Sequence, residues 1–346
     1  MIALAEKLAV QHSLTESEYQ LLLENPSAET AAFLAEKAVE ARKAAYGTDV
    51  YIRGLIEVGN ICKNDCLYCG IRRSNKKCQR YQLTSEEILD RCRAGYALGF
   101  RTFVLQGGEN PALRDDVLCP LIRDIKAEFP DCAITLSLGE RSRESYRRLK
   151  EAGADRYLLR HETASATHYR QLHPEEMSFE NRMECLRNLK ALGYQVGCGF
   201  MVGSPFQTAA HLAQDLKFIE EFHPEMCGIG PFIPHCDTPF GIHPSGSVDM
   251  TCYLLSIIRL IHPNILLPAT TALGTLDPEG REKGILSGAN VVMPNLSPSA
   301  VRKKYMLYND KLSDGEESAE CLDSLRRRME AIGYQIVTAR GDYKQN

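Results

Sequence analysis

Residues 97–109 read Ala97-Leu-Gly-Phe-Arg-Thr-Phe-Val-Leu-Gln-Gly-Gly-Glu109, and their order decides the fold. Gly99 ends a helical pattern, an apolar β-rich run follows, and the run ends in a polar, glycine-rich turn. A glycine in left-handed conformation commonly closes a helix and leads the chain into the next strand. The same helix-glycine-strand order recurs at residues 151–154 and 191–194, and a similar string at residues 331–334 follows the last predicted helix. The repeat predicts a chain built from βα units.

Eight β-rich runs alternate with helical patterns along the chain. The runs are residues 50–58, 102–106, 134–138, 156–160, 195–202, 226–232, 265–271 and 291–293, and the intervening helices are expected at 84–98, 120–129, 144–152, 179–192, 209–222, 249–261 and 277–286. Such alternation predicts parallel strands, an α/β fold and, by the strand count, a complete (β/α)8 TIM-type barrel. A doubly wound open sheet competes, but its G-x-G-x-x-G signature after the first strand is missing.

Two regions flank this pattern. Residues 1–48 are expected to form N-terminal helices that cap the barrel, one of them opened by a capping box at Thr15-x-x-Glu18. Residues 49–346 are expected to form the barrel together with a last helix over 317–332. Functional side chains should then lie at the carboxyl ends of the strands.

Composition narrows the class of protein. The 346 residues are 44% hydrophobic and 25% charged, with a net charge of −4 and no basic block, which argues against nucleic-acid binding. No apolar run approaches the roughly 20 residues of a membrane-spanning helix. Glu6 interrupts what would be the apolar part of an export signal, so we expect a cytoplasmic protein whose 13 cysteines are mostly reduced and buried.

Three of the 13 cysteines are spaced as metal ligands rather than scattered singly along the chain. Cys62, Cys66 and Cys69 have the spacing C-x3-C-x2-C directly after the first predicted strand. A closed zinc site usually needs a second ligand pair, and no second C-x-x-C exists. Three thiolates on one loop can instead hold three corners of one 4Fe–4S cluster, which leaves the fourth iron open to a small molecule. The three cysteines are therefore the predicted metal-binding and catalytic residues.

With Tyr68 before the last cysteine, the loop resembles the signature of the radical S-adenosylmethionine (SAM) superfamily. The resemblance implies that the open iron binds SAM, that one electron breaks the sulfonium–C5′ bond, and that the 5′-deoxyadenosyl radical attacks a substrate. It also implies SAM contacts. The glycine-rich stretch after the second strand would receive the ammonium group, Arg182 the carboxylate, and Glu162 with Ser137 the ribose hydroxyls. The predicted SAM-binding residues are Tyr68, Gln106, Gly107, Gly108, Glu109, Ser137, Glu162, Arg182 and Tyr305.

Four longer sequence segments point to one family within the superfamily. Residues 154–164, 228–235, 268–272 and 290–295 resemble the HydE family, the radical SAM maturases of FeFe-hydrogenase. The resemblance implies a closed cavity and a small substrate, a cysteine-bound iron carbonyl cyanide precursor of the hydrogenase active site. It further implies an electron donor such as ferredoxin or flavodoxin, and other maturases as possible partners. Arg156, Arg160, Thr270 and Thr271 match residues that line the lower cavity, where they would bind anions.

Some features depart from the family or favour other functions. Cys236 stands where the family usually has proline, and neither Cys236 nor Cys198 has an evident role. Only Cys321 remains in the region where some members hold a second cluster, so one cluster is expected. Biotin synthase is disfavoured because the second and third predicted strands carry no thiol. An amino-acid mutase resembling methylornithine synthase and a non-enzymatic iron–sulfur carrier remain alternatives.

Overall fold

A parallel sheet forms the frame of the molecule. The structure is a computed structural model and describes residues 1–313 and 318–345. Six strands pair in the order β2-β3-β4-β5-β6-β8, and every ladder is parallel. These strands are β2 (Gly54–Gly59), β3 (Thr102–Gly107), β4 (Ala133–Ser137), β5 (Arg156–Leu158), β6 (Gln195–Cys198) and β8 (Met226–Cys227).

Short contacts complete the ring of eight predicted strand positions. Met226 bridges Leu266, and Pro268 bridges Val291 of β10 (Val291–Val292), which pairs in turn with β1 (Asp49–Ile52). A last bridge joins Leu55 of β2 to Asn295. The seventh predicted strand, residues 265–271, is thus present only as these single bridges. The α/β class and the central parallel sheet are confirmed, and complete closure of the (β/α)8 barrel stays a prediction.

Two small pairings lie beside the ring. The pair β7 (Met201–Val202) and β9 (Gly230–Pro231) extends β6 and β8 beyond their ends. Strand β11 (Gln335–Val337), which follows the fourth repeat, adds to the free edge of β1. The sequence pattern had not indicated β11 as a strand.

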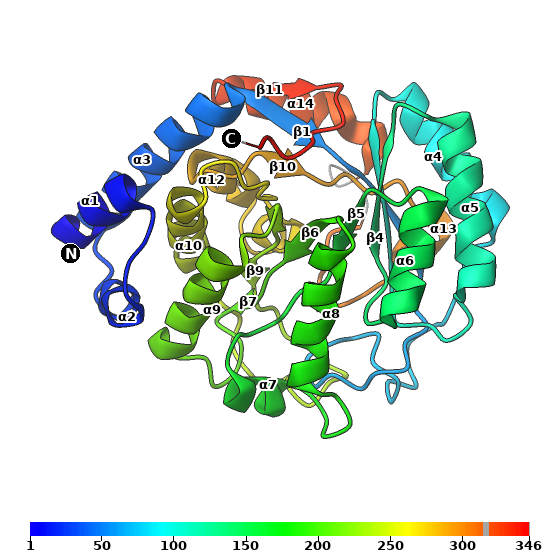
Figure 1. The fold of residues 1–346 in the computed structure, drawn as a ribbon, viewed down its shortest axis with the longest axis horizontal. Helices are drawn as coiled ribbons and strands as arrows, with labels where there is room; N and C mark the ends of the chain where they lie inside the picture. Colours follow the sequence, from blue (N-terminus) through cyan, green and yellow to red (C-terminus); the bar gives the residue numbers. More distant parts are fainter. Residues whose placement is uncertain (314–317, 346) are drawn as a thin grey trace.

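Helices cover the outside of the strands (Figure 1). Capping boxes at Thr84 and Thr208 fix where two of them begin. The observed helices are α4 (Ser85–Ala97), α5 (Asp115–Glu128), α6 (Arg143–Ala152), α7 (Ala166–Leu172), α8 (Phe179–Ala191), α9 (Ala209–Phe222), α10 (Val248–Ile261), α11 (Thr271–Leu276), α12 (Gly280–Leu286), α13 (Ser299–Arg302) and α14 (Leu322–Ala331).

Most helix boundaries agree with the predictions within a few residues, and two differ for clear reasons. Helix α5 begins at Asp115 and runs through Pro120, which had been taken as its start. The helix predicted at 277–286 begins only at Gly280, as α12, because Asp277 has an extended backbone, and α11 before it was not predicted. The final helix begins at Leu322, and Glu317, its predicted first residue, lies outside the described residues.

The N-terminal segment forms three helices, α1 (Ile2–Gln11), α2 (Glu16–Glu24) and α3 (Ala28–Tyr46). They pack against α9 and α10 on one side of the barrel (Figure 1). The buried guanidinium of Arg42 donates hydrogen bonds to the carbonyl oxygens of Gly47, Asp49 and Ala289, which fixes α3 to the amino end of β1. Division of the chain after residue 48 stays a prediction.

The amino ends of the strands are closed by the C-terminal segment. Arg156, at the start of β5, is fully buried and lies 2.6 Å from the carboxylate of Asp342. The nitrogen that contacts Asp342, Nη2, also donates to the carbonyl of Arg340, and Nη1 and Nε donate to Thr102 Oγ1 and Gln195 Oε1. The side chain therefore joins the chain end to the floor of the barrel. Among the described residues, no helix has the length and apolarity needed to cross a membrane.

We expect the barrel core to be sensitive to cavity formation at β3. Phe103 is fully buried and packs edge-on against Phe129. Phe103→Ala should reduce the free energy of unfolding by about 3–5 kcal/mol, because it removes a buried ring and leaves a void. Phe206→Ala is the matched control, since Phe206 is 54% exposed and its loss should change stability by less than about 0.5 kcal/mol. Urea unfolding followed by circular dichroism measures both, and equal losses would contradict the packing described here.

Candidate functional site

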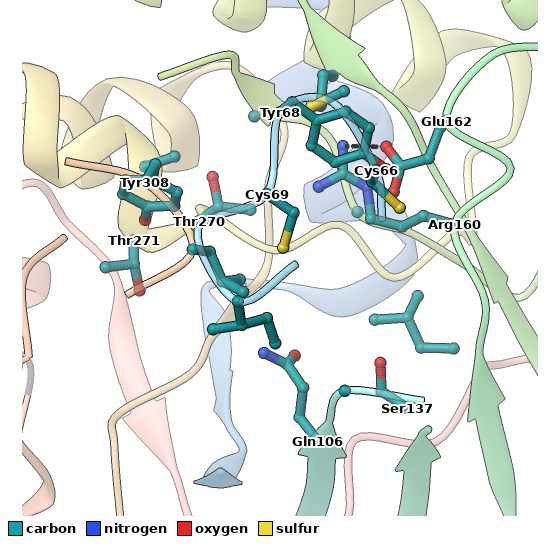
Figure 2. A pocket seen from close by; sticks show the side chains of 18 of the residues that line it. Cys66, Tyr68, Cys69, Gln106, Ser137, Arg160, Glu162, Thr270, Thr271 and Tyr308 are labelled. Carbon is teal, nitrogen blue, oxygen red and sulfur yellow. Dashed lines mark ion pairs between the residues drawn. The ribbon is translucent and has the colours of Figure 1, made fainter. Parts of the chain in front are cut away.

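A cavity of about 370 Å³ opens at the carboxyl ends of the strands. The loop after β2 supplies Cys62, Cys66 and Cys69 to its wall. The ends of β3 and β4 supply residues 106–109 and Ser137, and residues after β5, β9 and β10 complete it. Figure 2 shows the Cys66 and Cys69 sulfur atoms, the Gln106 amide and the Ser137 hydroxyl around one space. Side chains far apart in the sequence meet here because parallel strands end at one rim.

The cysteine loop is fixed by backbone hydrogen bonds to three other segments. Lys63 N–H donates to Glu109 O at 2.9 Å, Leu67 N–H to Leu172 O at 3.0 Å, and Gly70 N–H to Leu307 O at 2.8 Å. Gly108 packs directly beneath the loop, and a Cβ there would lie 2.4 Å from the carbonyl oxygen of Ile61. The three thiols are consequently held in place by the barrel rather than by the loop alone.

The thiols lie in a poorly solvated environment. Burial raises the pKa of Cys62 and Cys66, and burial together with Cys62 raises the pKa of Cys69 to about 12. Three crowded, buried thiols resist ionisation unless a strong positive charge lies among them. Iron ions supply such a charge, so the donor set fits an iron–sulfur cluster. The described cavity wall contains no other cysteine.

Tyr68 is positioned by a histidine. His173 Nδ1 lies 3.0 Å from the carbonyl oxygen of Tyr169, to which it can only donate a proton. Its Nε2 is therefore the acceptor for the Tyr68 hydroxyl, also at 3.0 Å. Both ring nitrogens of His173 are satisfied, as expected for a structural histidine, and they hold the tyrosine of the cysteine loop beside the cavity.

Charged side chains face one another across the opposite wall. Arg182, at the start of α8, donates from Nε to Glu140 at 2.6 Å and from Nη1 to the carbonyl of Arg160 at 2.8 Å. Its side chain is only 9% exposed, which excludes the alternative of a solvated helix arginine. Glu109 accepts a hydrogen bond from the Glu140 backbone N–H and covers Gly139, where a Cβ would overlap its carboxylate.

Glu162 adopts a strained backbone conformation at the end of β5. Its φ is +65°, a value that residues other than glycine rarely adopt and that clusters at functional sites. The carboxylate lies 3.2 Å from Arg160 (Figure 2), but the two groups are not aligned as a hydrogen bond. The strain is held by a backbone bond from Glu162 N–H to Gly199 O and by the buried pair His161–Asp215 behind it.

Several buried polar atoms on the cavity wall have no hydrogen-bond partner within the protein. They are Glu109 Oε2, Glu162 Oε2, Arg160 Nε and Nη2, and Thr270 Oγ1. Buried polar groups are rarely left unpaired. The wall is therefore suited to a polar, charged ligand such as SAM, and to a second polar molecule beside it.

The structure brings together nearly all of the predicted site residues and separates one. The three cysteines and all nine predicted SAM contacts lie on the cavity wall, as do Arg160, Thr270 and Thr271. Arg156 does not, because its guanidinium is held by Asp342 at the floor of the barrel. The depth of Arg156 below the cavity was not evident from the sequence.

Lys311 was missed by the sequence analysis. It lies on the cavity wall, 2.8 Å from Glu57, which is fully buried within the barrel and also accepts a hydrogen bond from Asn295. A lysine in an irregular segment ordinarily indicates solvent exposure, and no local pattern distinguished this one. Glu57, a charged residue inside a predicted strand, was the available signal.

Comparison with known proteins agrees with this geometry. Residues 56–219 match the model of the radical SAM superfamily. The chain is 47% identical to the [FeFe] hydrogenase maturase subunit HydE of Thermotoga maritima over 296 residues, which cover 86% of this chain and 84% of that protein. The chain belongs to the HydE family of the radical SAM superfamily. It is therefore a radical SAM enzyme, and the family implies a 4Fe–4S cluster and SAM.

More distant relatives share the fold over nearly the whole chain. The 3-methylornithine synthase of Methanosarcina barkeri is 28% identical over 96% of this chain and 93% of its own length. The crystal structure of methylornithine synthase (PylB) superposes with a TM-score of 0.81 at 26% identity, covering 96% of this chain and 97% of that one. The maturase HydG from Carboxydothermus hydrogenoformans has the same fold, with a TM-score of 0.79 at 21% identity over 96% and 78% of the two chains.

The buried His173 should make stability depend on pH. Burial and the neighbouring Arg182 lower the pKa of His173 from 6.5 to about 3. Below pH 6.5 the unfolded chain takes up a proton that the folded protein refuses until about pH 3. The free energy of unfolding should therefore fall as the pH falls through this window, by up to about 1.4 kcal/mol per pH unit.

His173→Gln removes this titration while keeping polar atoms beside Tyr68. Urea unfolding at pH 7.5 and pH 5.0 should show a smaller loss of stability in the variant than in the unmodified protein. The two pH dependences would run parallel if the imidazole were accessible to protons in the folded state.

Proposed function

We propose that this enzyme matures FeFe-hydrogenase by acting on a cysteine-bound iron carbonyl cyanide complex, the precursor of the hydrogenase active site. The 47% identity to the Thermotoga maritima HydE, over more than four fifths of both chains, carries the proposal. The long matched strings in residues 154–164 and 228–235 form the walls of the cavity or lie directly behind them.

Cys62, Cys66 and Cys69 would hold a single 4Fe–4S cluster as its three protein ligands. When bound with SAM at its open iron, such a cluster supplies the electron that splits the sulfonium–C5′ bond. The chain's part is to bind and orient. Residues 106–109 would receive the SAM ammonium, because their glycines allow backbone carbonyls to come close. Arg182 would pair with its carboxylate.

Glu162 and Ser137 would accept and donate hydrogen bonds at the ribose, which fixes the C5′ carbon relative to the rest of the cavity. Glu162 Oε2 faces Arg160 but accepts no hydrogen bond within the protein, which favours this assignment. Tyr305 is buried and Tyr68 half-buried at the cavity, and both would exclude water from the reacting atoms. Exclusion of water protects a carbon radical from side reactions.

The substrate would occupy the part of the cavity near Thr270, Thr271 and Tyr308, across from the cysteine loop (Figure 2). Thr270 Oγ1 has no hydrogen-bond partner there, and Arg160 lies on the other side of the cavity beside Glu162 (Figure 2), so an anionic complex with cyanide and carboxylate groups would lie between them. A small iron–sulfur or flavin protein, ferredoxin or flavodoxin, would deliver the electron, and other hydrogenase maturases would supply the substrate or receive the product.

A mutase related to methylornithine synthase is the second candidate. The TM-score of 0.81 to that enzyme, with nearly complete coverage of both chains, favours it. A cavity that binds an amino acid needs the same pairing groups for ammonium and carboxylate as one that binds a cysteine-held complex. Sulfur insertion of the biotin synthase type is less favoured, because Cys198 and Cys227 are buried in the hydrophobic core and do not line the cavity.

The cluster ligands should be indispensable for SAM cleavage. Replacement of Cys62, Cys66 or Cys69 by Ala should abolish release of 5′-deoxyadenosine from reduced, reconstituted protein, while circular dichroism shows the barrel still folded. Cys321→Ala is the matched control, because this thiol lies outside the cavity and its loss should leave turnover unchanged. Turnover that survives in all three cavity variants would refute the cluster assignment.

Two assays distinguish a hydrogenase maturase from an amino-acid mutase. Co-expression with an FeFe-hydrogenase in a strain that lacks HydE should restore hydrogen evolution, and incubation with lysine should give no isomer. Restoration should be lost in Cys69→Ala. Conversion of lysine without restored hydrogen evolution would establish the mutase instead.

A further inference from the structure

A second group of metal-ligand side chains lies outside the cavity. His235, Cys236 and Asp237 follow β9, and one ligand atom from each lies within 4.8 Å of the other two. The three offer an imidazole nitrogen, a thiol sulfur and a carboxylate oxygen. None of them lines the cavity described above. The proposed maturation chemistry makes no use of this group.

The turn that carries these residues is rigidly built. Thr238 donates to the carbonyl oxygen of His235 twice, from its backbone N–H at 3.0 Å and from its hydroxyl at 2.8 Å. Cys236 N–H donates to Asn309 Oδ1 at 3.0 Å. Gly241 packs against the turn, where a Cβ would lie 2.8 Å from the His235 oxygen. The backbone is thus already fixed. A metal would rearrange only side chains, and binding at His235 Nδ1 would displace the hydrogen bond that this atom accepts from the Asp237 backbone N–H at 3.1 Å.

The separations suit a borderline-soft divalent cation of the zinc class. With metal–ligand bonds of about 2.0–2.3 Å, tetrahedral ligand atoms stand about 3.5 Å apart. The ligand atoms, now up to 4.8 Å apart, would have to approach one another by about 1 Å. Rotation of the side chains can bring them this close, because Cys236 is exposed. Nitrogen, thiolate and carboxylate are the ligands that zinc prefers, and a water molecule would take the open fourth position.

Lys77 is the present partner of this group. Its ammonium lies 2.6 Å from the Asp237 carboxylate, and its side chain is 80% exposed. An exposed ion pair of this kind contributes little to stability, so the lysine can move into solvent when a cation arrives. Lys77 and the metal would therefore compete for the same carboxylate.

We propose that His235, Cys236 and Asp237 form a zinc-class metal site, separate from the cluster in the cavity. The site would lie next to the cysteine loop, because the His235 ring packs against Gly70, one residue from Cys69. A Cβ at Gly70 would lie 2.7 Å from His235 Nε2. A metal at the turn would fix the His235 side chain where it packs against the cluster loop at Gly70.

Zinc protection of Cys236 tests the site in the cluster-loaded enzyme. Anaerobic protein with a full complement of iron is treated with iodoacetamide, with and without zinc ions, and the alkylated peptides are quantified by mass spectrometry. Because the thiolate is the reactive form and a bound metal occupies it, zinc should slow alkylation of Cys236 at least about tenfold. Cys321 is the internal control and should be unaffected. Iron content measured in parallel shows that zinc has not displaced the cluster.

Three variants assign the ligands. His235→Gln and Asp237→Asn should each remove most of the protection, because two remaining ligands hold zinc weakly. Lys77→Ala should strengthen it, shifting half-protection to a lower zinc concentration, because the competing ammonium is gone. The proposal would be overturned if zinc did not protect Cys236 in the unmodified protein. It would also be overturned if His235→Gln and Asp237→Asn were protected as strongly as the unmodified protein.

Discussion

The shared direction of the strands is the constraint on which the site depends. In the β2–β3–β4 ladders, Glu57 is level with Gln106, and Gln106 with Ser137. Because the strands are parallel and in this register, their carboxyl ends finish at one rim. The loops that leave the rim begin beside one another although they lie 30 to 50 residues apart in sequence. Reversal of any one strand would move its loop to the opposite end of the barrel.

The cysteine loop illustrates how the rim imposes geometry on an irregular segment. Residues 60–81 form no helix or strand, and only a bridge between the flanking residues Gly59 and Gln82 closes the segment, so the loop has no frame of its own. Its position comes from backbone hydrogen bonds to Glu109, Leu172 and Leu307, which lie on three different parts of the fold. The thiols are held close together where burial opposes their ionisation. Such an arrangement is costly for an empty site and favourable for one that binds a cation.

On the cavity wall opposite the cysteine loop, the charged side chains differ in how far their charges are compensated within the protein. Arg182 is tied to Glu140 and to the backbone of Arg160, so most of its charge is already compensated inside the protein. Arg160, Glu162 and Thr270 are not compensated to the same extent, and they keep unpaired polar atoms at the cavity. The fixed pairs supply shape and the unpaired atoms supply affinity. This division is typical of sites that are formed before the ligand arrives.

The sequence by itself determined the α/β architecture and the cysteines and many of the polar side chains of the cavity wall. Helix-ending glycines such as Gly99 and Gly153 define each βα unit locally, and the cysteine spacing defines the loop, because both signals depend on neighbours in the chain. Only the tertiary structure decided how deep each side chain lies in the barrel and which distant residues it contacts. Arg156 and Arg160 belong to the same strand region, yet one closes the barrel floor with Asp342 and the other faces the cavity. Lys311 meets Glu57 across 254 residues, and His235 meets Gly70, because long-range packing sets these contacts and local sequence patterns carry no record of it.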